Sequence, residues 1–292
     1  MGPHRPDVPP VRALLGPQQA VDTGPADSAD LAVATATPRA TMAVMADLPL
    51  PPTLPRARKG CVYLVGAGPG AADLITLRGW AILASADVAV VDALADRALY
   101  QDLPLRIVQA GKRGGDHGIQ QADIHALLIE LAGQGLAVVR LKGGDPFVLG
   151  RGSEEVLALT AAGVAVEVVP GVSSALAAPA LGGIALTHRG VAEGFAVVSA
   201  HVADGLPPFP PYTGRLTLVV LMGVANRAQW LPQLLALGWP ASLPMAWVTW
   251  AGRPEQTVMR TTIGACAEAG DRLALVSPSV AVIGAVAALE LG

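Results

Sequence analysis

Short apolar runs of strand length alternate with segments of helix length from Gly60 onward. Such alternation is typical of α/β proteins, in which helices cover the faces of a sheet. In the first half we expect strands at Cys61–Val65, Val88–Val91, Arg106–Gln109, Ala137–Leu141 and Val164–Val169. In the second half we expect strands at Phe195–Ser199, Leu216–Leu221, Met245–Thr249, Gln256–Thr261 and Val280–Ile283. The pattern therefore predicts an α/β fold built from two α/β domains.

The alternation is interrupted at residues 182–190, GGIALTHRG. We therefore expect an N-terminal α/β subdomain over residues 60–186 and a C-terminal α/β subdomain over residues 187–292, with a cleft between them. Residues 1–58 differ in composition, because they are rich in Pro, Ala, Asp and Thr and keep no period. A disordered extension is predicted for them, and a targeting or docking tail and an over-long start are the alternatives.

The composition disfavours proteins that bind nucleic acid or anionic membranes and proteins that span a membrane. The chain has 292 residues and a net charge of -3, so it gives no electrostatic reason to expect nucleic acid or an anionic membrane as a partner. The most apolar tract, Leu273–Leu291, is broken by Pro278 and Gly284, so we expect a strand and a helix there and no membrane span. Ala, Gly and Val dominate the chain, which favours buried parallel strands.

Cysteine usage bears on metal binding and on the cell compartment. Cys61 and Cys266 are the only cysteines, and neither lies in a paired spacing such as CxxC. No metal site is therefore expected. Two isolated cysteines fit a reducing cytoplasm, and the N-terminus lacks the charged-then-apolar layout of a signal peptide.

Glycine-rich turns follow three of the expected strands in the first half. They read VGAGPGAAD at Val65–Asp73, RLKGGDPFVLGRG at Arg140–Gly152 and VPGVSSA at Val169–Ala175. Glycine packs no side chain and costs conformational entropy, so these clusters indicate backbone that a ligand must approach closely. Because ligands of open α/β sheets bind at the carboxyl ends of the strands, we expect the turns to converge on one ligand site.

The first turn also matches a dinucleotide fingerprint. Gly66, Gly68 and Ala71 satisfy GxGxxG/A, and Asp92 closes the next strand at a distance that suits a ribose hydroxyl. A Rossmann-type NAD-dependent dehydrogenase is therefore one alternative. Pro69 argues against it, because proline removes a backbone donor from the loop that would hold the pyrophosphate.

The second turn favours a nucleoside with a charged tail. Gly143 and Gly144 let backbone amides approach such a ligand, and Asp145 can accept hydrogen bonds from an ammonium or a ribose group. A simple turn at Asp145–Pro146 is the alternative.

Six segments occur in a fixed order along the chain: VYLVGAGPG, VVD, GKRGG, VRLKGGDPFVLGRG, VPGVSSALAAPALGGIALTHR and LMGV. From about Cys61 to the C-terminus they resemble the tetrapyrrole (precorrin) methylase family, and within it the enzymes that methylate uroporphyrinogen III. The segments LKGGDPFVLGRG and GIALTHR are specific, whereas GAGPG is shared across the wider family. The resemblance implies two α/β domains with S-adenosylmethionine in the cleft between them, in a homodimer.

The resemblance also implies an activity and its residues. It implies methylation of uroporphyrinogen III at C2 and C7, which gives precorrin-2 by way of precorrin-1 and releases S-adenosylhomocysteine, for cobalamin or sirohaem synthesis. Asp92 would be the general base and Lys112 the general acid. The contacts with S-adenosylmethionine would be Pro69, Gly143, Gly144, Asp145, Val148, Ser173, Ser174, Met222 and Ala251.

The chemistry of this reaction suits the residue types. Methyl transfer to carbon needs no metal and depends on holding two partners in line. The methylated ring is cationic and must lose a proton, so a carboxylate at a strand end, such as Asp92, suits a base; a helix N-cap or a turn residue is the alternative. Lysine is rare in the chain, and while Lys112 could protonate the substrate or pair with a propionate, we expect Lys142 to orient its turn.

The implied substrate carries eight carboxylates. Arg113, Arg151, His188 and Arg189 are expected to pair with some of them, because guanidinium groups suit carboxylates; surface ion pairs are the alternative for each. Gly252 stands where the family often has threonine, so Ala251 is expected to act through its backbone. A methylase of a later corrinoid and a non-catalytic sensor also remain open, although Asp92 and Lys112 together disfavour a sensor.

Overall fold

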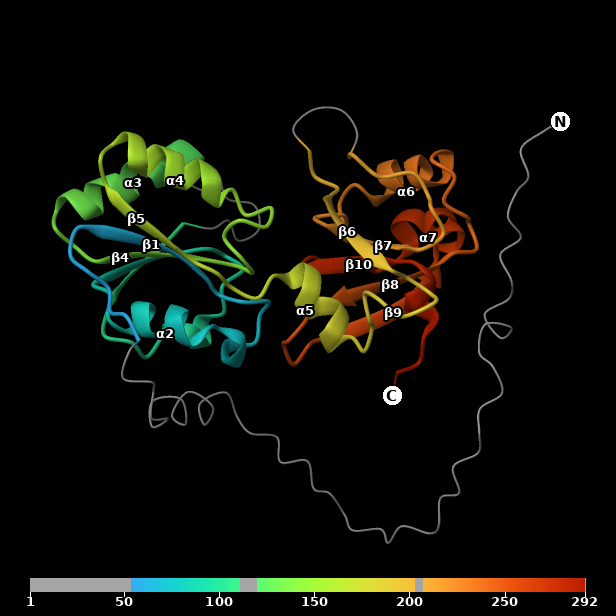
Figure 1. The fold of residues 1–292 in the computed structure, drawn as a ribbon, viewed down its shortest axis with the longest axis horizontal. Helices are drawn as coiled ribbons and strands as arrows, with labels where there is room; N and C mark the ends of the chain where they lie inside the picture. Colours follow the sequence, from blue (N-terminus) through green and yellow to red (C-terminus); the bar gives the residue numbers. More distant parts are fainter. Residues whose placement is uncertain (1–53, 111–119, 203–206, 292) are drawn as a thin grey trace, which may run out of the picture. The chain divides into compact units, whose positions relative to one another are not determined.

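The first of two sheets is entirely parallel. A computed structural model describes residues 54–110, 120–202 and 207–291. The first sheet has the strand order β3-β2-β4-β1-β5, and its neighbouring strands pair in parallel (Figure 1). Its strands are β1 (Cys61–Gly66), β2 (Val88–Val91), β3 (Arg106–Gln109), β4 (Val138–Lys142) and β5 (Ala165–Val169). Because all five run the same way, the turns that follow them lie at one edge of the sheet.

Helices cover both faces of this sheet. α2 (Leu77–Ala84) packs on one face through Trp80 and Leu83. α3 (Gln121–Gly133) and α4 (Gly152–Ala161) pack on the other face through Leu128 and Leu159 (Figure 1). Successive strand residues point to opposite faces, so the apolar run of β1 is buried on both sides. α2 starts at Leu77 because the Thr76 side chain caps it by accepting a hydrogen bond from the Gly79 amide.

The second sheet is mixed, which corrects our expectation of buried parallel strands. Its order is β6-β7-β10-β8-β9; β6 and β7 pair in parallel, and the other neighbours pair antiparallel. Its strands are β6 (Gly194–Ser199), β7 (Leu216–Leu221), β8 (Pro244–Thr249), β9 (Thr257–Thr262) and β10 (Ser279–Ile283). Residues 250–256 are too few for a parallel crossover, which needs about a dozen residues, so β8 and β9 form a hairpin.

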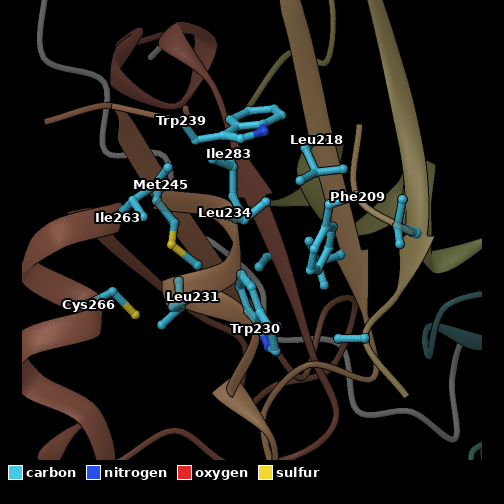
Figure 2. Packing of buried hydrophobic residues seen from close by; sticks show 14 of the residues in the cluster. Phe209, Leu218, Trp230, Leu231, Leu234, Trp239, Met245, Ile263, Cys266 and Ile283 are labelled. Carbon is cyan, nitrogen blue, oxygen red and sulfur yellow. The ribbon is translucent and has the colours of Figure 1, made fainter. Parts of the chain in front are cut away.

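A tryptophan-rich core fills one face of the second sheet. Trp230 of α6 (Arg227–Ala236) lies 6.0 Å from Trp247 of β8 between ring centroids. Cys266 of α7 (Ile263–Ala269) is buried in the same cluster (Figure 2). Burial raises the pKa of the Cys266 thiol, so this cysteine is a packing residue.

The chain passes from the first sheet to the second between β5 and the next helix. α5 (Ser174–Leu181) packs through Ala175 and Ala178 on the face of the second sheet opposite the tryptophans. Sequence reasoning grouped this segment with the first half, but its small apolar face completes the second core. The division into subdomains 60–186 and 187–292 stays a prediction.

The rest of the described chain consists of short segments. Residues 54–58 of the expected tail form no helix or strand, and residues 1–53 lie outside the described part. Within the described ranges, no helix is long and apolar enough to cross a membrane. The described ranges contain four short 3-10 helices, at Ala72–Leu74, Arg97–Leu99, Gly270–Arg272 and Ala285–Ala288.

Candidate functional site

The three glycine-rich turns converge at the carboxyl edge of the first sheet, as the sequence predicted. A Cβ atom built on Gly66 would lie 2.6 Å from the Gly144 carbonyl oxygen, and one built on Gly171 would lie 2.6 Å from the Gly66 Cα. Gly144 also donates its amide to the Gly68 carbonyl oxygen at 2.8 Å. Any side chain at Gly66 or Gly171 would push these turns apart, so the close approach requires glycine there.

Asp145 holds two of these turns together, which differs from the contacts expected for it. Its Oδ2 accepts a hydrogen bond from the Gly171 amide at 3.0 Å, and its Oδ1 accepts one from the Phe147 amide at 2.8 Å. We expected the carboxylate to accept from an ammonium or a ribose group. Each carboxylate oxygen has lone pairs to spare, so such a contact stays a prediction.

The start of α5 packs beside the second turn. A Cβ on Gly144 would lie 3.6 Å from the Ser174 nitrogen. Ser173 is buried, and its hydroxyl caps the helix by accepting from the Ala175 amide at 3.2 Å. Pro69 is half-buried in the first turn, and Val148 is exposed after the second.

The second sheet brings Met222 and Ala251 to its own carboxyl edge. β6 and β7 are parallel, and β7 and β8 both run antiparallel to β10, so the three strands end on one side. The loop after β8 contacts the first turn, because a Cβ on Gly70 would lie 2.7 Å from the Ala251 carbonyl oxygen. In the same loop Arg253 donates to the Leu94 carbonyl oxygen at 3.1 Å. Pro69 and Ala251 therefore belong to neighbouring turns.

Backbone strain is concentrated in these turns. Among the described residues, the non-glycine residues with positive φ are Leu149, Arg151, Met222 and Trp250, with values of 52–57°. Each such residue costs on the order of 1–3 kcal/mol, and strained residues cluster at functional sites. All four follow strands at the two edges just described, so the strain marks the same candidate site.

Asp92 directly follows β2 at the edge of the first sheet. Its amide donates to the Leu141 carbonyl oxygen at 2.9 Å, and its Oδ1 accepts from the Ala93 amide at 2.8 Å. Lys142, at the end of the neighbouring strand β4, is buried and pairs with Glu155 of α4 at 3.0 Å. Burial lowers the pKa of the Lys142 ammonium, and Arg140 lowers it further, whereas Glu155 and Asp92 act in the opposite direction.

Sequence reasoning missed Glu155 and its second partner, Arg140. Arg140 Nε donates to Glu155 Oε1 at 3.1 Å, and both side chains are buried. The signal was present in the sequence, because a charge inside a buried apolar strand requires a partner.

The basic residues expected to bind substrate lie in different parts of the chain, and some lie outside the described residues. Arg151 is exposed at the start of α4 and pairs with Glu154 at 2.8 Å, which raises the pKa of its guanidinium. His188 and Arg189 lie in an exposed turn, where His188 Nδ1 is 2.9 Å from the Arg189 carbonyl oxygen. Lys112 and Arg113 lie outside the described residues.

The geometry does not support the dinucleotide alternative. In the Rossmann order the strand that carries the acidic residue lies beside the first strand. Here β4 lies between β1 and β2, so Asp92 is two strands away from the Gly66 turn. The helix that the fingerprint should open starts only at Leu77.

Metal ligands were not expected, and within the described ranges no group of three or more His, Cys, Asp or Glu side chains could hold a metal ion. The site instead offers close-packed backbone, a half-buried carboxylate at Asp92 and a buried ion pair behind it.

Comparisons with known proteins agree with this geometry. A uroporphyrinogen-III C-methyltransferase of Synechococcus elongatus is 41% identical over 234 residues, which are 79% of this chain and 95% of that protein. A siroheme synthase of Chromobacterium violaceum is 40% identical, and this chain spans only 50% of its length. The crystal structure of a Thermus thermophilus uroporphyrin-III C-methyltransferase complexed with S-adenyl homocysteine is 42% identical, with a TM-score of 0.69 over 77% of this chain and 97% of that one.

The family model described as Tetrapyrrole (Corrin/Porphyrin) Methylases matches residues 61–267, a range that includes the three glycine turns, Asp92 and the strained positions Met222 and Trp250. The chain belongs to the tetrapyrrole methylases.

Proposed function

We propose that this chain methylates uroporphyrinogen III at C2 and C7 with S-adenosylmethionine, giving precorrin-2 by way of precorrin-1 and two molecules of S-adenosylhomocysteine. The observation that carries the proposal is the convergence of the turns at Gly66, Gly144 and Gly171 beside Asp92. It is supported by relatives about 40% identical that are named for this reaction, and by a relative crystallised with S-adenyl homocysteine.

The turns fit a ligand such as S-adenosylmethionine. The glycine contacts hold the three turns together, backbone against backbone, and the ligand would bind along the edge that these turns form. Gly143, Gly144 and Asp145 would hold its methionine end. Further contacts would come from Pro69, Val148, Ser173, Ser174, Met222 and Ala251. When bound, S-adenosylmethionine supplies a methyl group on a sulfonium sulfur.

The side chains around the turns would orient the substrate and accept its proton. Holding the nucleophilic ring carbon in line with the methyl group is the main task of the chain, because orientation carries much of the rate in such a displacement. After the new carbon–carbon bond forms, the ring is cationic and releases a proton, which Asp92 would accept. Lys112 would act as the general acid.

The basic residues would bind the acidic rim of the substrate. Arg151 is exposed beside the second turn, with 58% of its side chain accessible, and a guanidinium can form bidentate pairs with propionates. Arg113, His188 and Arg189 would complete the set.

We also propose an oligomeric state and a cell compartment for the protein. It would be a cytoplasmic homodimer without nucleic acid or membrane partners, and its product would feed cobalamin or sirohaem synthesis. Cys61 and Cys266 are both free and buried, which fits a reducing compartment. Light scattering of the purified chain tests the dimer: a monomer mass at micromolar concentration contradicts it.

A turnover assay tests the activity. The purified chain is incubated anaerobically with uroporphyrinogen III and S-adenosylmethionine, and the product is followed by mass and absorbance. Addition of two methyl groups is expected, and Asp92→Asn should lose turnover while it still binds S-adenosylhomocysteine in calorimetry. Binding of S-adenosylhomocysteine without any methylation would overturn the proposed substrate in favour of a later corrinoid or a sensor role.

A further inference from the structure

Two cations of β4 share one buried carboxylate. Arg140 and Lys142 are 4% and 3% exposed, and Glu155 of α4 is fully buried. Residues two apart on a strand point to the same face, so both cations face the helices α3 and α4. Lys142 Nζ lies 3.0 Å from Glu155 Oε1 and Oε2, and Arg140 Nε lies 3.1 Å from Oε1.

The charges of this cluster do not balance. Two cations and one carboxylate leave one positive charge in excess, and an uncompensated buried charge is costly. Gln121 of α3 adds a neutral donor to Glu155 Oε1 at 3.2 Å and so brings no negative charge. A lysine ammonium has three donors, and Glu155 Oε1 accepts one of them. The remaining donors are available to a neighbouring carboxylate.

Asp92 lies beside Lys142 at the strand ends and acts on its charge, although within the described residues no ion pair of 4.0 Å or less joins the two side chains. Val91 and Leu141 are partners in the parallel pairing of β2 with β4, and Asp92 donates its amide to the Leu141 carbonyl oxygen. Asp92 and Lys142 therefore follow as the next neighbours on strands that lie about 4.8 Å apart. Partners in a parallel pair point to the same face, so the two side chains lie on the same side of the sheet.

We propose that Lys142, anchored by Glu155, is a positioning residue whose positive charge orients the neighbouring Asp92 carboxylate at the candidate site. This inference rests on the proposed function, in which Asp92 accepts the proton. Lys142 is too deeply buried to contact a macrocycle, so it acts through Asp92. The anchor is needed because a lysine side chain is flexible and a single strand-end contact would not fix it.

Arg140 provides a matched control for a test of this role. Lys142→Met and Arg140→Met each remove one cation from the same buried carboxylate and leave a balanced pair behind. The two substituted residues differ in their distance from the end of β4. Lys142 is the last residue of the strand and neighbours Asp92, whereas Arg140 lies two residues earlier. Lys142→Met should lower kcat at least about tenfold, while KM and the affinity for S-adenosylhomocysteine stay within about threefold. Arg140→Met should change kcat less than about threefold, and Lys142→Arg should restore part of it.

Equal losses of kcat in the two methionine variants would overturn the inference and leave the cluster a purely structural role. Crystal structures of both variants give a readout that does not need turnover: the Asp92 carboxylate should move in Lys142→Met and stay in Arg140→Met. If Asp92 does not move in Lys142→Met, the inference is overturned, whether or not the wild-type chain methylates uroporphyrinogen III. Failure of the wild-type chain to methylate uroporphyrinogen III would count only against the proposed function. Lys142→Gln, which keeps a donor for Glu155, replaces Lys142→Met if that variant fails to fold.

Discussion

The Asp145 carboxylate accepts a hydrogen bond from the Gly171 amide, with 3.0 Å between Oδ2 and the nitrogen. This bond ties the turn after β4 to the turn after β5. Asp145→Ala removes the acceptor and leaves two backbone amides unpaired, so we expect the affinity for S-adenosylhomocysteine in calorimetry to fall at least about tenfold. Asp145→Asn keeps one acceptor oxygen and should lose less. Wild-type affinity in Asp145→Ala would refute this role.

Substitution of Gly171 should separate the turns. In Gly171→Ala the new Cβ would lie 2.6 Å from the Gly66 Cα and closer still to the Gly144 carbonyl oxygen. Backbone cannot yield as a flexible side chain does, so we expect the free energy of unfolding to fall by at least about 2 kcal/mol. Urea unfolding followed by circular dichroism measures it.

Gly133 is the control for the loss of a glycine. It lies in α3, and a Cβ built there meets nothing within 4 Å. Gly133→Ala should therefore leave stability unchanged or raise it by up to about 1 kcal/mol, because alanine favours the helix. Similar losses in both variants would contradict the packing argument.

Adjacent glutamates of α4 should differ sharply in their effect on stability. Glu155→Gln removes the carboxylate that the buried Arg140 and Lys142 share, which should cost about 3–5 kcal/mol in chemical unfolding. Glu154→Gln breaks an exposed pair with Arg151 and should leave stability almost unchanged, since solvent screens such pairs. The expectation fails if the two variants unfold at the same denaturant concentration.

Arg151→Ala should weaken substrate binding more than catalysis. The residue is exposed beside the second turn, so we expect KM for uroporphyrinogen III to rise about tenfold with little change in kcat. Arg215 is a matched control, because its side chain is 66% exposed and pairs with Glu193 away from the turns. Steady-state kinetics give the KM for uroporphyrinogen III in both alanine variants. An equal rise in KM in the two would contradict a specific role for Arg151.

Much of the fold could be predicted from the sequence. Apolar runs placed every strand within about two residues, because burial of a strand on one or both faces needs such a run. The glycine turns and their convergence could be predicted for a related reason, since parallel strands end at one edge. The antiparallel pairing of β8, β9 and β10 could not, because strand direction depends on connections and partners that apolar patterns do not encode.

The site was predicted less completely than the fold. Asp145 could be singled out, but its bond to Gly171 joins residues 26 positions apart and has no local signal. Glu155 was missed because a glutamate near a helix start is usually solvated, and only the buried cations of the neighbouring strand explain it. The packing of α5 on the second sheet had no signal either, since its small residues do not reveal which core they complete.

The left-handed residues Leu149, Arg151, Met222 and Trp250 have a consequence for engineering. Glycine or asparagine would relieve the strain at each position, so selection for heat resistance should enrich these replacements. Selection for turnover should reject them wherever the side chain contributes to the site. A position where glycine or asparagine is enriched by the first selection and rejected by the second would be one whose side chain takes part in the reaction. Comparing the two selections at these four positions would therefore locate the functional site without any bound ligand.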